Sequence, residues 1–148
     1  MTKDVIVKIR GLQAGQDLDG EPIEMITKGE YFFKNGKHYL LYDEVMENET
    51  AVTKNRMKVA PGLMELKKSG LVSVHMVFEE HKENLTQYHT PYGTLTMGIT
   101  AHEILLHEDE DAIDIAVDYA LSINEEHTAD CNIKISVRPQ GKSNFQII

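Results

Sequence analysis

The chain has only one cysteine, Cys131, among its 148 residues, so it cannot form an internal disulfide. Cys131 lies within an alternating apolar pattern, where a small buried side chain is expected; a reactive thiol would need an open, electropositive setting. No apolar run approaches the roughly 18 residues that a membrane-spanning helix requires. We therefore expect a cytoplasmic protein without a membrane segment.

Motifs of catalysis and of cofactor binding are also missing. The sequence contains no glycine-rich phosphate loop, no motif around a nucleophilic serine or cysteine, and no zinc-hydrolase spacing. We therefore predict no catalytic residue and no cofactor, and a binding role is favoured over an enzymatic one. An acid–base pair that only the fold assembles would leave no such motif, so an enzyme stays open as a third alternative.

Acidic residues outnumber basic ones, and the net charge is −9. This excess argues against a nucleic-acid partner and against anionic membranes. The charge is unevenly distributed, because residues 51–82 carry six basic and three acidic groups while the segments on both sides are acidic. A local basic patch of this kind still allows a small anionic ligand.

Most of the sequence alternates between apolar and polar residues, which predicts strands with one buried face. The clearest stretch is 111–124, where odd positions from Ile113 onward are large and apolar. Asn35–Gly36 lies between two aromatic segments and predicts a tight hairpin turn. A polar gap over 124–130 is expected to connect the long strand to another over 131–137.

We count about ten strands and no convincing helix. Their expected positions are 5–10, 22–34, 39–42, 51–59, 63–68, 71–78, 85–90, 95–101, 111–124 and 131–137. Gly98 is expected to mark a bulge or bend. Short turns build an antiparallel meander, and closure into a barrel removes its exposed edges.

The sequence therefore predicts an all-β fold, a single closed up-and-down barrel of about 8–10 strands. This barrel forms one domain over 1–148, with a core over 4–138 and a C-terminal tail over 139–148. About ten strands can enclose a cavity if some inward side chains are small.

The segment Tyr88-His89-Thr90-Pro91-Tyr92-Gly93-Thr94-Leu95 resembles the uncharacterised bacterial YwiB-like family. The similarity extends over about 4–138 and includes Met76-Val77-Phe78 and Thr53-Lys54-Asn55-Arg56. It implies a calycin-like β-barrel, related in shape to lipocalins and fatty-acid-binding proteins. The resemblance brings no activity with it, because no motif of that family has an assigned chemical role.

The leading functional hypothesis is a barrel that binds a small, partly apolar or anionic ligand in its interior. The alternative is a protein-interaction or structural module with a filled barrel, including a homodimer. The two differ in whether the interior holds a pocket or the outer surface carries a patch.

The basic residues Lys54, Arg56 and Lys58 share one face of their strand and are candidate ligand-binding residues. If they face outward they form a solvated surface, as alternating strands commonly do. If they face inward, three cations line the cavity and select a carboxylate or phosphate group.

His75, Tyr88, His89 and Tyr92 are the remaining candidate ligand-binding residues. Tyr88, His89 and Tyr92 flank a Pro–Gly turn, where they either contact a ligand at the rim or lock the turn. His75 faces His89 if the hairpin turns at Lys82, yet no further His or Cys completes a zinc site, so no metal is predicted. The acidic run 108–111 lacks the glycine and terminal glutamate of a calcium loop and is expected to be a charged turn.

Overall fold

The computed structural model describes residues 3–11, 24–45, 52–70 and 73–140, and these form strands and turns. None of the described segments is a helix of the length and apolar character needed to cross a membrane. The strands are β1 (Asp4–Arg10), β2 (Glu24–Lys34), β3 (Lys37–Val45), β4 (Val52–Ala60), β5 (Leu63–Ser69), β6 (Val74–Glu79), β7 (Glu83–Thr90), β8 (Gly93–Asp109), β9 (Ala112–Ile123) and β10 (Glu126–Pro139).

All ten strands belong to one antiparallel sheet in the order β6-β5-β4-β3-β2-β1-β10-β9-β8-β7. The two edge strands, β6 and β7, follow each other in sequence. They approach at Ser73 and His89, whose backbone groups exchange hydrogen bonds of 3.2 and 3.1 Å, and at the turn that pairs Glu79 with Lys82. The sheet therefore forms a nearly closed barrel, as the strand pattern predicts.

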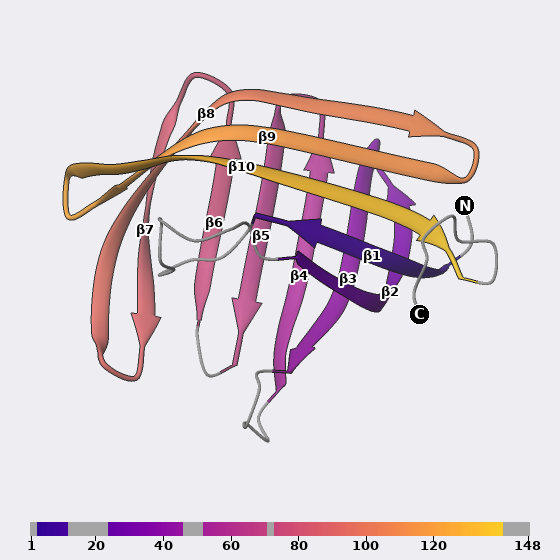
Figure 1. Ribbon diagram of the computed structural model, residues 1–148, viewed down its shortest axis with the longest axis horizontal. Coiled ribbons are helices and arrows are strands. Elements are labelled where there is room, and N and C mark those ends of the chain that lie inside the picture. Colours follow the sequence, from indigo (N-terminus) through magenta and orange to yellow (C-terminus); the bar gives the residue numbers. More distant parts are fainter. Residues whose placement is uncertain (1–2, 12–23, 46–51, 71–72, 141–148) are drawn as a thin grey trace.

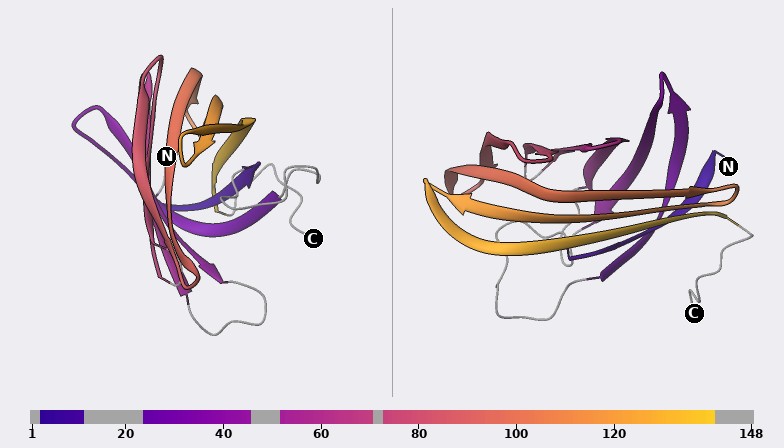
Figure 2. Two further views of the ribbon diagram at one scale, coloured as in Figure 1. Left: turned by 90° about the vertical axis from the view of Figure 1, so that its left-hand side faces the viewer. Right: turned by 90° about the horizontal axis from the view of Figure 1, so that it is seen from above.

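The barrel has two groups of strands that run in different directions. In Figure 1, β9 and β10 cross the view in front, whereas β3 to β6 run nearly at right angles behind them. β8 belongs to both groups, because it starts beside β7 and curves over to run along β9. The β2–β3 hairpin projects away from this body in the right-hand view of Figure 2.

The curvature of β8 comes from a bulge, and this part differs from the prediction. A strand over 95–101 was expected, but β8 continues to Asp109, with a register shift between Ala101 and Glu103. The extra residue switches the buried side chains from odd to even positions, which hides the continuity of the strand in the sequence. The carboxylate of Glu80 accepts a hydrogen bond of 3.0 Å from the backbone N–H of Ile104, just beyond the bulge.

The polar gap predicted over 124–130 is wrong, because β10 already begins at Glu126. Asn124 and Glu125 alone form the turn, with φ values of 51° and 73°. A two-residue turn with positive φ matches the twist of the strands that it joins. The polar residues that follow lie on an exposed part of β10. At Asn35–Gly36 the hairpin prediction is confirmed, with φ values of 54° and 76°.

The interior of the barrel is packed with apolar side chains from all ten strands. Phe78 is fully buried and meets Tyr119 edge to face with ring centroids 5.0 Å apart. The predicted odd-numbered face of β9 is buried from Ile113 to Leu121. Cys131 is half-buried beside this core, and burial raises the pKa of its thiol, as expected of an unreactive cysteine.

Candidate functional site

The predicted basic residues lie on the outer face of β4. Thr53, Asn55, Met57 and Val59 are buried toward the interior, so the intervening Lys54, Arg56 and Lys58 face outward. The Lys58 ammonium forms an ion pair with Glu65 on β5, which raises the pKa of the lysine and lowers that of the glutamate. The cations therefore belong to the outer wall of the barrel.

The predicted histidine pair does not form, because the register differs from the one assumed. Ser73, and not His75, stands opposite His89. The ring of His75 instead lies 3.2 Å from the Glu65 carboxylate, and that of His89 lies 3.1 Å from the Thr94 hydroxyl. Within the described residues, no group of three or more His, Cys, Asp or Glu side chains could hold a metal ion.

The two tyrosines of the predicted rim are separated by the turn. Tyr88 is buried against the core, whereas Tyr92 is 99% exposed. Burial, assisted by the negative charge of Glu44, raises the pKa of the Tyr88 phenol. The structure thus brings Tyr88 to the barrel interior and leaves Tyr92 and His89 on the surface.

A different cluster gathers where the β2–β3 hairpin approaches the end of β8. His38 on β3 is 4% exposed, and its Nδ1 lies 2.7 Å from the Tyr31 hydroxyl on β2. Its Nε2 lies 3.7 Å from the Glu108 carboxylate, and the ring of Phe33 packs edge to face against the imidazole at 4.9 Å. Side chains from β2 and β8 therefore contact one buried histidine of β3.

Burial dominates the electrostatics of this cluster. It lowers the pKa of His38, although the nearby Glu108 carboxylate acts in the opposite direction. Burial and the charge of Glu108 both raise the pKa of Tyr31. At neutral pH the imidazole and the phenol are therefore uncharged, and Glu108 supplies the charge of the cluster.

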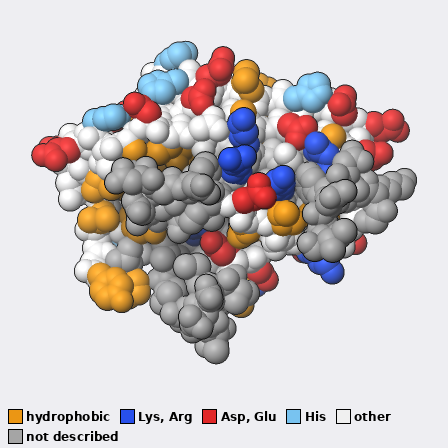
Figure 3. All heavy atoms as spheres, in the orientation of Figure 1, with side chains coloured by type: hydrophobic (Ala, Val, Ile, Leu, Met, Phe, Trp, Pro, Cys, Tyr) orange, Lys and Arg blue, Asp and Glu red, His pale blue; other side chains and the backbone are white. Residues whose placement is uncertain are grey.

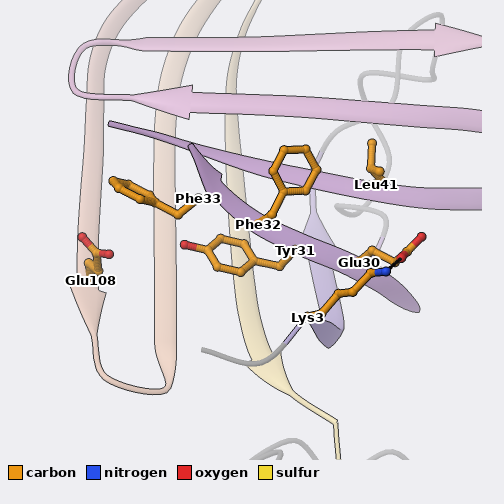
Figure 4. A pocket seen from close by; sticks show the side chains of 7 residues that line it. All are labelled: Lys3, Glu30, Tyr31, Phe32, Phe33, Leu41 and Glu108. Atoms are coloured by element: carbon orange, nitrogen blue, oxygen red, sulfur yellow. Dashed lines mark ion pairs between the residues drawn. The ribbon is translucent and has the colours of Figure 1, made fainter. Parts of the chain in front are cut away.

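This cluster borders an open depression of about 690 Å³. The register of β1 with β2 ends at Asp4 and Glu30, followed by a hydrogen bond of 2.7 Å from the Tyr31 N–H to the Lys3 carbonyl oxygen, and the tip of β2 extends past this point. Figure 4 shows the side chains of this site, with Phe32 and Phe33 on different sides of the β2 strand. The lining residues are Lys3, Glu30, Tyr31, Phe32, Phe33, Leu41 and Glu108. Lys3 and Glu30 form an ion pair of 3.2 Å.

A second depression of about 620 Å³ shares Glu30 and Leu41 with the first. It is lined by residues of β2 to β5 together with Asp4 and Gln140. The lining includes the outward-facing Lys54, Arg56 and Lys67, and also Tyr42 and Asn55. We call the two depressions together the outer trough. One end of the trough is aromatic and the other is cationic.

The cationic end has an unusual arrangement of like charges. Arg56 stands directly opposite Lys67 across the β4–β5 ladder, and like charges at such positions destabilise a sheet. No ion pair joins either side chain to another residue of the described chain, in contrast to the Lys58–Glu65 pair nearby. A bound anion would offset this repulsion.

The aromatic end lies beside these cations, on the neighbouring strands β2 and β3. Leu41 stands opposite Arg56, and Phe32 stacks on Tyr39 with ring centroids 4.8 Å apart and planes 8° apart. Phe32 and Phe33 are 42% and 56% exposed. On the face shown in Figure 3, by contrast, acidic side chains and histidines gather along the upper border.

Sequence reasoning identified Lys54 and Arg56 but missed the other residues of this region. The acidic run 108–111 predicts a charged turn for Glu108, and no sequence pattern links it to His38, which lies 70 positions away. The exposed pair Phe32–Phe33 was the available signal, since two adjacent aromatic residues in one strand cannot both point into the core.

Comparison with known proteins identifies the family. Residues 7–135 match the family described as a domain of unknown function, DUF1934. The chain belongs to this family. It is 30% identical over 113 residues to the uncharacterised beta-barrel protein YwiB of Bacillus subtilis (strain 168), covering 75% of this chain and 78% of that protein.

The fold is shared with a solved structure. The crystal structure of the ywiB protein from Bacillus subtilis superposes with a TM-score of 0.75 at 23% sequence identity, and covers 93% of this chain and 92% of that one. This likeness supports the barrel architecture of the DUF1934 chain. The match agrees with the resemblance drawn from the Tyr88–Leu95 segment.

Proposed function

We propose that the protein binds a small organic anion with an apolar body in the outer trough. The observation that carries this proposal is the continuity of the two depressions, which share Glu30 and Leu41 and differ in chemistry at their ends. The ligand class is the partly apolar anion expected from the sequence. Its place is the wall of the barrel, because packed side chains occupy the interior.

The cationic end favours a phosphate or carboxylate group. Arg56 offers a planar set of donors that matches either anion, and Lys67 adds a second positive charge directly across the ladder. The Ser69 hydroxyl, opposite Lys54, adds a neutral donor at the margin. Asp4, Glu30 and Asp43 also line this depression and Lys28 adds a cation on β2, so the residues on β4 and β5 that carry charge here, Lys54, Arg56 and Lys67, are all positive.

The aromatic end favours a flat or apolar body. Phe32 presents a ring already stacked on Tyr39, and Leu41 forms an apolar floor between that ring pair and Arg56. Aromatic stacking and apolar burial at such a site contribute about 1 kcal/mol or more to binding. A ligand that reaches from Phe32 to Arg56 gains from both ends.

The test uses three probes that separate the two contributions: adenosine monophosphate, adenosine and inorganic phosphate. Adenosine monophosphate combines a flat apolar body with a phosphate, and we expect it to bind more tightly than either part. Isothermal titration with Arg56→Gln should show about a tenfold or greater loss for the nucleotide, because a charged hydrogen bond is removed. Phe32→Ala should weaken the nucleotide and adenosine but leave phosphate unchanged.

Lys58→Gln is the matched control, since Lys58 shares the strand and face of Arg56 but is paired with Glu65. This variant should bind like the wild type. Equal losses in Arg56→Gln and Lys58→Gln, or equal affinity for the nucleotide and phosphate, would refute the proposal. A complete loss of nucleotide binding at high salt, in the wild type and in every variant, would mean that the binding is general charge attraction and not a specific site.

A further inference from the structure

A row of three polar side chains interrupts the apolar lining on the inner side of the barrel wall. Tyr42, Asn55 and Lys68 are adjacent in register on β3, β4 and β5, with Tyr42 opposite Asn55 and Asn55 opposite Lys68. Tyr42 and Asn55 are 4% and 3% exposed. Four residues of β3, or about 13 Å, separate the level of His38 from that of Tyr42, where this row lies.

The contacts in this row fix the orientation of the amide. The Nδ2 of Asn55 donates to the Glu44 carboxylate at 3.4 Å and to the Thr53 carbonyl oxygen at 3.3 Å. Both partners are acceptors, so the Asn55 nitrogen faces them and Oδ1 is turned away. The Lys68 ammonium bonds to the same Glu44 carboxylate at 2.9 Å.

Two buried atoms of the row are left without a hydrogen bond. The Tyr42 hydroxyl and Asn55 Oδ1 have no partner within the described part of the chain. Burial and the charge of Glu44 raise the pKa of Tyr42, so the phenol keeps its proton and remains a donor. Buried polar groups are almost always satisfied by protein, water or ligand, and leaving them unsatisfied is unfavourable.

We infer that Tyr42 and Asn55 form a binding niche for a neutral group that both accepts and donates a hydrogen bond, such as an alcohol hydroxyl or a primary carboxamide. Such a group accepts from the Tyr42 hydroxyl and donates to Asn55 Oδ1. A carboxylate has no proton to donate and would lie near Glu44. An ammonium group has no acceptor for the phenol and would lie near Lys68.

A more exposed ion pair lies next to the niche. Exposure of the side chains increases from Tyr42 and Asn55 to Lys68 at 13% and Glu44 at 26%. The Glu44–Lys68 pair is therefore the more exposed neighbour of the two buried groups, and Asn55 bonds to its carboxylate. Tyr42 and Asn55 also border the second depression, but their side chains are buried and alternate with the outward-facing Lys54 and Arg56, so the niche and the cationic end of the trough use different side chains.

Three probes of similar size and different hydrogen-bonding capacity test the inference: acetamide, acetate and methylammonium. Titration of the wild-type protein, followed by amide and side-chain NMR signals, should give saturable shifts at Asn55 and Tyr42 with acetamide only. Shifts of equal size with acetate or methylammonium would overturn the assignment. Absence of a saturable acetamide shift would also overturn it and would mean that the niche holds water alone.

Tyr42→Phe removes the donor while keeping the ring, and Tyr39→Phe on the outer face of the same strand is the control. We expect Tyr42→Phe to weaken acetamide binding about tenfold, the effect of one lost hydrogen bond, and Tyr39→Phe to leave it unchanged. Unchanged acetamide affinity in Tyr42→Phe contradicts the inference. The wild-type titration decides the question on its own if this variant does not fold.

Discussion

The His38→Gln variant should lose less free energy of unfolding on acidification than the wild type does. Burial holds the pKa of His38 below its ordinary value, although Glu108 opposes this effect. The unfolded chain therefore binds a proton at a higher pH than the folded protein does. Stability contributed by the neutral imidazole is present above about pH 6.5 and is lost as the pH falls toward the pKa of the folded state.

The size of this effect has an upper limit. One proton taken up by the unfolded state alone changes the free energy of unfolding by about 1.4 kcal/mol per pH unit. The unfolded chain is already half protonated at about pH 6.5, so between about pH 6.5 and about pH 5.5 the wild type should lose up to about 1 kcal/mol more than His38→Gln does. Glutamine retains a partner for the Tyr31 hydroxyl, which lies 2.7 Å from the imidazole in the wild type.

Urea unfolding of both proteins at the two pH values measures this difference, and NMR titration of the His38 ring reports its pKa directly. Glu108→Gln should make the loss on acidification steeper, because it removes the attraction that opposes the downward shift. A His38 pKa above 6.5, or equal pH dependence in the wild type and His38→Gln, would refute this reasoning.

Two substitutions test the packing. Ile115→Asp on the buried face of β9 loses about 2–3 kcal/mol of apolar burial and places a charge in the core. It should therefore fail to fold, whereas Leu105→Asp on the exposed face of β8 should fold; a soluble, folded Ile115→Asp protein would show that the register is wrong. Glu80→Ala should lower the free energy of unfolding by about 1–3 kcal/mol, because the Ile104 N–H at the β8 bulge loses its acceptor. Chemical denaturation measures this change, and an unchanged free energy of unfolding would contradict the prediction.

The strands could be predicted from sequence because most of them have one apolar face and end at recognisable turns. The alternation in β9 and the Asn35–Gly36 turn depend only on neighbouring residues, and both agree with the structure. The bulge in β8 could not be located, because one inserted residue reverses the pattern and makes a long strand resemble a short one. The tight turn at Asn124–Glu125 was missed because positive φ at a glutamate is uncommon.

The candidate sites were harder to predict, because their residues are brought together only by the register of distant strands. His38 and Glu108 meet because the β2–β3 hairpin approaches the end of β8. The outward direction of Arg56 follows from the burial of Asn55 and Met57, and sequence alone left the polar face of β4 undecided. A buried asparagine amid apolar residues gives no sequence signal that separates it from an outward-facing one.

The most direct test of the central claim, a ligand site on the outer wall and not in the interior, is an NMR titration with adenosine monophosphate. The methyl groups of Met57, Met64, Met76 and Met97 report on the core, since all four side chains are buried. The methyl groups of Leu41 and the side-chain Nε–H of Arg56 report on the trough. We expect saturable shifts at Leu41 and Arg56 with the methionine signals unchanged, whereas saturable shifts confined to the methionines would contradict the account.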